Sequence, residues 1–183
     1  MGFSNNIILI GFMGSGKTST GKELAKLLKY NFWDMDQWIE EKNNKKVSEI
    51  FRERGEEYFR SQEREAVGWL KNKDHYIVSV GGGTWIDQEN REKLLRLGRC
   101  IWLMVSPEKV LERIGSHLSQ RPILAQAENP LREINNILSA RIPFYSLAHL
   151  SFTTDEKKPK EIALEIVEAL KEDNFFDLPT VQK

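Results

Sequence analysis

The sequence has little of what marks secreted, membrane-spanning or nucleic-acid-binding proteins. It has one cysteine, Cys100, so no disulfide can form within the chain and a reducing compartment is expected. Its 27 basic and 27 acidic side chains cancel to a formal net charge of zero, which gives no general attraction to nucleic acid or to an anionic membrane. No run approaches the roughly 18 apolar residues of a membrane-spanning helix, and no charged leader with an apolar stretch opens the chain. These absences predict a cytoplasmic protein that binds neither nucleic acid nor a membrane.

Metal-ligand spacing, internal repeats and low-complexity segments are also missing. The three histidines, His75, His117 and His149, lie far apart in the sequence, which disfavours a zinc site. The 183 residues are 40% hydrophobic and 30% charged, as in globular domains, and no linker divides them. We therefore expect a single domain over residues 1–172, followed by a frayed tail over residues 173–183.

The most informative stretch lies near the start of the chain. Gly11 and Gly16-Lys17-Thr18 fit the phosphate-binding pattern G-x-x-x-x-G-K-[ST], the P-loop. The apolar run at 7–10 predicts a buried strand before it, and residues 18–28 predict a helix after it. Such a loop places backbone N–H groups around a phosphate at a helix N-terminus. We expect Lys17 to reach the β- and γ-phosphates of a nucleotide and Thr18 to bind Mg²⁺. The alternative, a glycine-rich turn that fits by chance, is disfavoured by the flanking strand and helix.

The rest of the chain alternates strands and helices. Strands are expected at 31–36, 75–80, 100–105 and 151–154, and helices at 37–43, 47–54, 56–71, 88–97, 107–115, 130–145 and 159–170. This alternation predicts an α/β fold with a parallel sheet covered on both faces. Ligands bind beyond the carboxyl ends of such strands. Polar or glycine-rich segments follow three strands, at 11–18, 34–36 and 81–83, so we expect them to meet in one crevice.

The chain resembles the shikimate kinases, small P-loop enzymes of the nucleoside-monophosphate-kinase-like group, from about residue 7 to about residue 170. The resemblance rests on the P-loop, Asp34-Met35-Asp36, Phe51 through Gly55-Glu56 to Phe59-Arg60 and Glu63, Gly81-Gly82-Gly83, Arg121-Pro122, and Arg141 with Pro143 and Tyr145. It implies a three-layer αβα P-loop kinase with a five-stranded parallel sheet in the order 2-3-1-4-5. It also implies a monomer that uses ATP and Mg²⁺ to phosphorylate the 3-hydroxyl of shikimate, a step of aromatic amino acid biosynthesis.

The resemblance assigns the nucleotide and metal to the first half of the chain. The loop residues expected to bind the nucleotide phosphates are Gly14, Ser15, Gly16, Lys17, Thr18 and Ser19. Asp34 is placed near Mg²⁺ with Thr18, and Asp36 holds the acceptor hydroxyl and takes its proton. Asp34 and Asp36 are two apart on a segment expected to be extended, so they should point the same way. A solvated Asp-x-Asp loop is the alternative.

The resemblance also implies which residues bind the acceptor, shikimate. Arg60 and Arg141 grip the shikimate carboxylate, because a guanidinium offers a planar fork that lysine lacks. Glu63 orients Arg60, and Gly82 and Gly83 bring backbone N–H groups to substrate oxygens. The alternatives are an exposed salt-bridged stripe for Glu56, Arg60 and Glu63, and a flexible turn for the glycines.

A closing loop is expected at 115–129, which is polar and lies between two helices. In the resemblance Arg121 is the catalytic arginine of this lid and reaches the ATP phosphates on closure; a surface arginine is the alternative. Whether Arg113, Lys157 or Pro159 contact adenine stays open, and the spacing from Arg113 to Arg121 is one residue longer than the family leads us to expect.

Two other functions are compatible with parts of the sequence. Gluconate kinases and nucleoside monophosphate kinases share the P-loop and the lid, but the Asp34-x-Asp36 pair and the stretch from Gly55 to Arg60 disfavour them. A nucleotide-binding paralogue without activity is disfavoured because the expected catalytic positions Lys17, Asp36 and Arg121 are all occupied.

Overall fold

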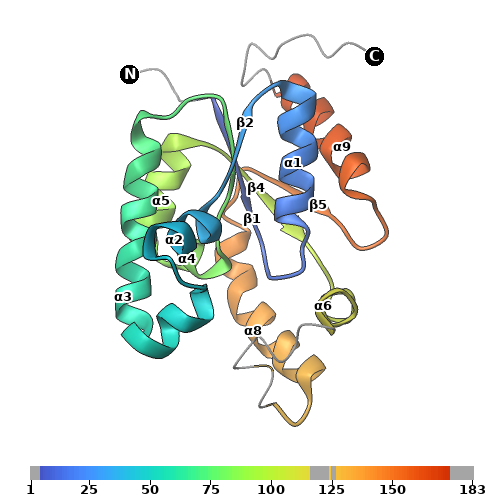
Figure 1. Cartoon of the computed structure of the whole chain (residues 1–183). Helices are drawn as coiled ribbons and strands as arrows, with labels where there is room; N and C mark the ends of the chain where they lie inside the picture. Colours follow the sequence, from blue (N-terminus) through green and yellow to red (C-terminus); the bar gives the residue numbers. More distant parts are fainter. Residues whose placement is uncertain (1–4, 116–123, 125–126, 174–183) are drawn as a thin grey trace.

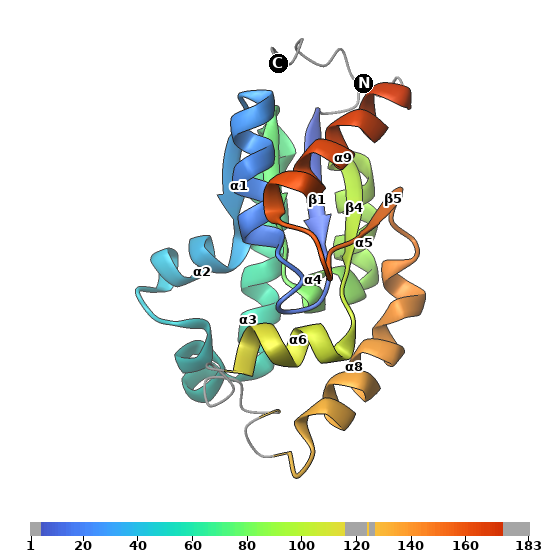
Figure 2. The same ribbon diagram turned by 90° about the vertical axis from the view of Figure 1, so that its right-hand side faces the viewer.

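The protein is described by a computed structural model that covers residues 5–115, 124 and 127–173. A parallel five-stranded sheet runs through its centre, with helices on both faces (Figures 1 and 2). The strands are β1 (Asn6–Ile10), β2 (Asn31–Asp34), β3 (Tyr76–Ser79), β4 (Gly98–Met104) and β5 (Leu150–Thr153). Their order is β2-β3-β1-β4-β5, which confirms the predicted order and the predicted fold class.

The sheet is buried because β1 is apolar on both faces. Successive side chains of a strand point to opposite faces, and Ile7, Ile8, Leu9 and Ile10 are all fully buried. Ile7 and Leu9 pack with the helices α1 (Lys17–Leu28) and α9 (Pro159–Glu172), which lie side by side on one face. Ile8 and Ile10 belong to the larger core on the other face.

The other described helices supply most of the side chains of interest. They are α2 (Met35–Asn43), α3 (Val47–Trp69) with the 3₁₀ turn η1 (Leu70–Asn72), α4 (Gly82–Ile86), α5 (Gln88–Leu97), α6 (Pro107–Ile114) and α8 (Pro130–Tyr145). α3 contains the predicted break at Gly55, whose φ of 79° is not helical. α4 was not predicted, because a triple glycine is more typical of a turn.

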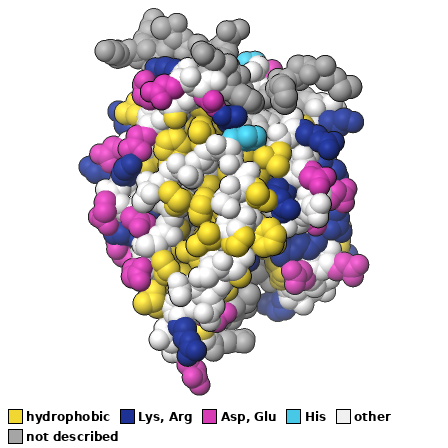
Figure 3. All heavy atoms as spheres, turned by 180° about the vertical axis from the view of Figure 1, so that it is seen from behind, with side chains coloured by type: hydrophobic (Ala, Val, Ile, Leu, Met, Phe, Trp, Pro, Cys, Tyr) yellow, Lys and Arg dark blue, Asp and Glu magenta, His cyan; other side chains and the backbone are white. Residues whose placement is uncertain are grey.

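The surface agrees with the balanced composition. On the face opposite to that of Figure 1, apolar side chains gather in the middle, and side chains of both charges lie around the margins (Figure 3). Large apolar side chains that remain exposed include Ile142, Leu147 and Leu164. Among the described helices, none is both long enough and apolar enough to cross a membrane.

Candidate active site

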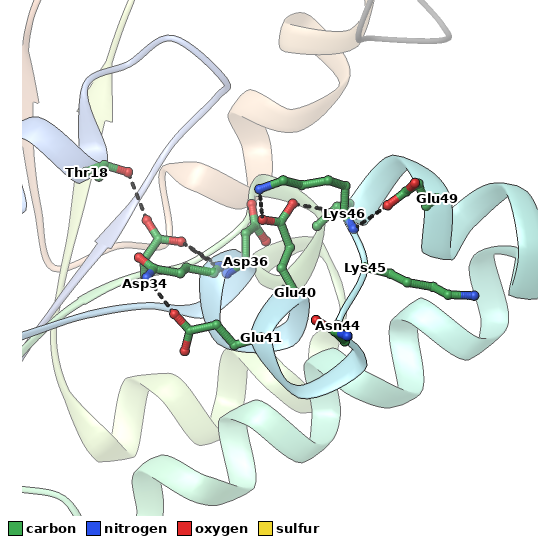
Figure 4. Close-up of a pocket in the computed structure, with 11 residues that line it drawn as sticks. Thr18, Asp34, Asp36, Glu40, Glu41, Asn44, Lys45, Lys46 and Glu49 are labelled. Carbon is green, nitrogen blue, oxygen red and sulfur yellow. Dashed lines mark hydrogen bonds and ion pairs between the residues drawn. The ribbon is translucent and has the colours of Figure 1, made fainter.

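Three chain segments meet at the carboxyl edge of the sheet, as the sequence predicted. Together with Arg141 of α8 they form a cavity of about 360 Å³, lined by Met13, Gly14, Gly16, Lys17, Thr18, Ser19, Asp34, Asp36, Ser79, Gly81, Gly82 and Arg141. A wider hollow of about 790 Å³ shares Thr18, Asp34 and Asp36 with it and extends between α2 and the start of α3 (Figure 4). Most residues predicted for the site therefore lie around one crevice.

The first segment is the glycine loop between β1 and α1. Gly11 has a φ of 146°, and a Cβ there would lie 2.6 Å from the Leu103 carbonyl oxygen, so only glycine fits. Gly16, with a φ of 85°, precedes the first residue of α1, Lys17. The loop thus turns sharply from a buried strand into a helix N-terminus, the arrangement that leaves backbone N–H groups for an anion.

Two side chains of this loop carry its chemistry. The Lys17 ammonium donates hydrogen bonds to the carbonyl oxygens of Gly11 and Phe12, both at 2.9 Å, so it lies across the loop. The Thr18 hydroxyl donates to Asp34 Oδ2 at 2.9 Å (Figure 4). Unlike Lys17 and Thr18, Ser15 does not line the cavity. Its side chain is fully buried, and its backbone N–H donates to the Phe12 carbonyl at 3.2 Å.

The second segment corrects an expectation about Asp34 and Asp36. Only Asp34 is extended; it ends β2 and is the N-cap of α2, so Asp36 lies in the first helical turn. Asp34 Oδ1 accepts hydrogen bonds from the backbone N–H groups of Asp36 at 3.1 Å and of Gln37 at 3.3 Å. The two carboxylates nevertheless line the same cavity. An aspartate before a helical pattern is a common N-cap, and that signal was available in the sequence.

The Thr18 and Asp34 oxygens could hold Mg²⁺. This ion prefers oxygen ligands, keeps several of its waters and needs only one or two protein groups besides phosphate. A hydroxyl and a carboxylate 2.9 Å apart at the mouth of the phosphate loop fit that requirement. The described residues contain no group of three or more His, Cys, Asp or Glu side chains that could form a dedicated metal cage.

Arg60 lies on α3 between two acids. Its Nη2 donates to Glu56 Oε1 at 2.9 Å and its Nη1 to Glu63 Oε2 at 2.7 Å. Glu63 is 1% exposed and also accepts a hydrogen bond from the Thr84 hydroxyl at 2.6 Å. Burial alone would lower the pKa of Arg60, but the hydrogen bonds and charges of Glu63 and Glu56 outweigh it and raise that pKa. The guanidinium is therefore a fixed positive charge on a buried support.

The third segment is Gly81-Gly82-Gly83, which leads from β3 into α4. Arg60 and Arg141 lie beside it. A Cβ on Gly83 would lie 3.0 Å from Arg60 Nη2, and one on Gly82 would lie 3.1 Å from Arg141 Nη1. Arg141, on α8, also has its guanidinium 5.6 Å from the centre of the Phe12 ring, a cation–π distance. Gly82 and Gly83 thus leave room for one arginine from α3 and one from α8, and they begin a helix, with Gly81 as its N-cap, instead of forming a turn.

Several residues near the site were missed by the sequence argument. The Tyr145 hydroxyl is beside Gly82, and burial raises the pKa of Tyr145. Thr84 holds Glu63, and Ser79 and Gly81 line the cavity. Tyr145 was visible in the sequence as part of the pattern around Arg141, but hydroxyl contacts such as that of Thr84 have no sequence signal.

The remaining predicted residues fall elsewhere. Arg121 and most of the lid expected at 115–129 lie outside the described residues, as does the tail beyond residue 173. Lys157 donates to Glu165 at 2.7 Å, and Pro159 is the first residue of α9. Arg113 donates to the carbonyl oxygen of Gly14 in the phosphate loop at 3.0 Å.

Known proteins resemble this chain over most of its length. The sequence model of the shikimate kinase family matches residues 13–171. A shikimate kinase of Thermus thermophilus is 44% identical over 164 residues, which cover 90% of this chain and 89% of the relative. A shikimate kinase of Moorella thermoacetica is 44% identical over 167 residues, which cover 91% and 94% of the two chains.

Solved structures agree. The shikimate kinase from Acinetobacter baumannii, in complex with shikimate, superposes with a TM-score of 0.87 at 33% identity and covers 93% of this chain and 94% of its own. A gluconokinase from Sinorhizobium meliloti has a TM-score of 0.58 at 18% identity, which shows a shared fold only. With the P-loop, the sheet order and these matches together, the chain belongs to the shikimate kinase family.

Proposed function

We propose that this protein transfers the γ-phosphoryl group of ATP to the 3-hydroxyl of shikimate, giving shikimate 3-phosphate and ADP. The observation that carries the proposal is the pair of arginines, Arg60 and Arg141, at the start of α4, of which Arg141 also lines the cavity of the phosphate loop. A carboxylate held there would place the ring of its owner toward the γ-phosphate. The related protein from Acinetobacter baumannii is described in complex with shikimate.

The phosphate loop binds ATP in this proposal. Backbone N–H groups of Gly14 and of residues 16–19 surround the phosphates at the N-terminus of α1, while the Ser15 N–H donates to the Phe12 carbonyl. Lys17 leaves the two loop carbonyls that it contacts and pairs with the β- and γ-phosphates, which offer it charged acceptors instead of neutral ones. Phosphoryl transfer needs mainly such positioning and charge stabilisation.

The two arginines and α4 bind shikimate. Arg60 and Arg141 each present a guanidinium fork to the carboxylate, while Glu63, fixed by Thr84, keeps Arg60 in place. The first turn of α4, at Gly82 and Gly83, offers backbone N–H groups to substrate oxygens.

Asp36 takes the proton. It lines the cavity that holds Lys17 and Gly82, so a hydroxyl between the two ligands would lie within its reach. As that oxygen bonds to the γ-phosphorus, the bond from phosphorus to the ADP oxygen breaks and the hydroxyl proton passes to the Asp36 carboxylate. Asp34 stays on its N-cap contacts and, with Thr18, would hold Mg²⁺, which neutralises phosphate charge when bound.

Arg121 completes the proposal from sequence alone, because it lies outside the described residues. The family resemblance gives it the role of bringing a positive charge to the transferring phosphoryl group when the lid closes. A monomer in the cytoplasm likewise remains a prediction of the sequence.

The test is an acceptor panel. ADP release with ATP and Mg²⁺ should respond to shikimate, and should stay at the background rate with gluconate, AMP or CMP. A response to gluconate or to a nucleotide in place of shikimate would assign a different kinase activity. No response to any acceptor, with ATP bound, would favour a nucleotide-binding paralogue without activity.

A further inference from the structure

Arg113, a partly buried arginine of α6, donates hydrogen bonds to two distant segments of the chain. Its Nη1 donates to the Gly14 carbonyl oxygen at 3.0 Å and to the Thr154 hydroxyl at 3.1 Å. Its Nη2 donates to the carbonyl oxygens of Thr154 at 2.5 Å and of Asp155 at 3.1 Å. One planar guanidinium thus joins the phosphate loop to the segment between β5 and α9, through uncharged acceptors.

The segment on the far side of Arg113 is firmly held. Thr154 is fully buried, and its backbone N–H and its hydroxyl both donate to the Met104 carbonyl at 2.9 Å. Asp155 Oδ1 accepts a hydrogen bond from the backbone N–H of Ser106, the N-cap of α6, at 2.9 Å. Arg113 therefore connects the loop, through Thr154, to the Met104 carbonyl at the end of β4.

Arg113 holds the phosphate loop at Gly14, a residue with an unusual backbone conformation. Gly14 lines the cavity and has a φ of 73°, a conformation that most residues avoid. α6 also packs there, since a Cβ on Gly14 would lie 3.2 Å from Ile114 Cγ2. Restraining the Gly14 peptide restrains the neighbouring N–H groups of the loop.

We propose that Arg113 is a positioning residue for phosphate binding: it braces the P-loop against Thr154 and Asp155 so that the loop is formed before the nucleotide arrives. Preorganisation raises affinity because less ordering is left to be done on binding. This role differs from contact with adenine, which the sequence left open. It rests on the proposed function only in taking the P-loop as the site of the ATP phosphates.

The two roles are separated by a ligand without a base. We would titrate magnesium tripolyphosphate and magnesium ATP into the wild type, Arg113→Ala and Arg113→Lys, and follow binding by calorimetry. The brace predicts that Arg113→Ala weakens both ligands by a similar factor, about tenfold for several lost charge-assisted hydrogen bonds. Arg113→Lys should restore only part of the loss, because an ammonium cannot reproduce the planar fork. A loss confined to ATP would show a base contact and overturn the brace, as would unchanged affinity for both ligands.

Arg91→Ala is the matched control. Arg91 likewise donates to backbone carbonyls, those of Trp85 and Ile86, both at 3.0 Å, but it does so on α5. Its loss should leave tripolyphosphate affinity unchanged, so an equal loss in Arg91→Ala would reduce the Arg113 effect to general destabilisation and overturn the proposal.

A gentler variant covers the case in which Arg113→Ala does not fold. Thr154→Val keeps the shape of that side chain and removes one acceptor of Arg113. It should weaken tripolyphosphate binding in the same direction by a smaller factor, and unchanged affinity would contradict the brace. These titrations need no acceptor, so they remain decisive even if shikimate fails as a substrate.

Discussion

The two halves of the crevice are built in different ways. The phosphate half is made by the backbone: Gly11 and Gly16 adopt conformations that suit glycine, and Lys17 and Arg113 donate to neutral carbonyls. The acceptor half is made by charged side chains from separate elements. Arg60 pairs with Glu56 and Glu63 on α3 and lies beside Gly83 of α4. Arg141 comes from α8 and lies beside Gly82 of the same helix, α4.

The difference separates general from specific recognition. A backbone cradle suits the phosphate chain that all nucleoside triphosphates share. A pair of guanidinium forks suits one carboxylate at one distance. We therefore expect substitutions in the acceptor half to change affinity for shikimate alone, and substitutions that act on the reacting phosphoryl group to change turnover.

The largest effect is expected for Arg121→Ala. The family resemblance gives Arg121 the role of reaching the ATP phosphates when the lid closes, where it would stabilise the charge of the transferring phosphoryl group. Removing this arginine should lower turnover by roughly a hundredfold to a thousandfold, the scale of one lost electrostatic contact in a transition state. ATP affinity, measured by titration, should change much less. A fully active variant would remove Arg121 from the mechanism.

Asp36→Asn should come next. The amide keeps the size of the side chain but cannot accept the proton, so turnover should fall by about a hundredfold or more. Steady-state rates measure the loss, and titration with ATP should show binding as in the wild type. Near-normal turnover would leave Asp36 with a structural role in α2.

Arg60→Lys tests the acceptor half by itself. Lysine keeps the positive charge and loses the fork, so shikimate affinity should fall by about tenfold or more, since such bonds contribute roughly 1.5–3 kcal/mol. Calorimetric titration with shikimate measures the change. Unchanged affinity would reject the proposed carboxylate contact.

Gly83→Ala sharpens the same test with a smaller effect. The new methyl group would meet the Arg60 guanidinium, the end of a flexible side chain, so Arg60 must shift while the fold does not. We expect shikimate affinity to fall a few-fold and the melting temperature to hold or rise, because alanine favours a helix by up to about 1 kcal/mol over glycine.

Gly68→Ala is the control for that variant. Gly68 also lies in a helix, α3, and a Cβ there would meet nothing within 4 Å. It should give the same gain in helix stability with no change in shikimate affinity. An equal loss in both variants would show that the effect does not pass through Arg60.

The phosphate half was the more predictable from sequence. Its pattern is local, since the glycines, Lys17 and Thr18 occupy one short stretch with its strand and helix beside it. The sheet order came from the family resemblance, and the structure confirms it.

The acceptor half was predicted as a set of residues, but of its contacts only the pairing of Glu63 with Arg60 was predicted, and the structure confirms it. α4 forms from a glycine-rich stretch because tertiary contacts hold it: Thr84 donates to buried Glu63, and the Trp85 indole donates to the Phe144 carbonyl. The local helix propensity of Gly82 and Gly83 gives no hint of this. The contact of Arg113 with carbonyls far away in the sequence is equally invisible, because every residue offers a carbonyl.

The measurement that tests the two-part site most directly is a pair of titrations on two variants. Lys17→Ala and Arg60→Lys would each be titrated with ATP alone and with shikimate alone. The account predicts opposite patterns: Lys17→Ala loses ATP affinity and keeps shikimate affinity, while Arg60→Lys keeps ATP affinity and loses shikimate affinity. Equal losses of both ligands in either variant, or loss of ATP alone in Arg60→Lys, would contradict the division of the crevice into a phosphate half and an acceptor half.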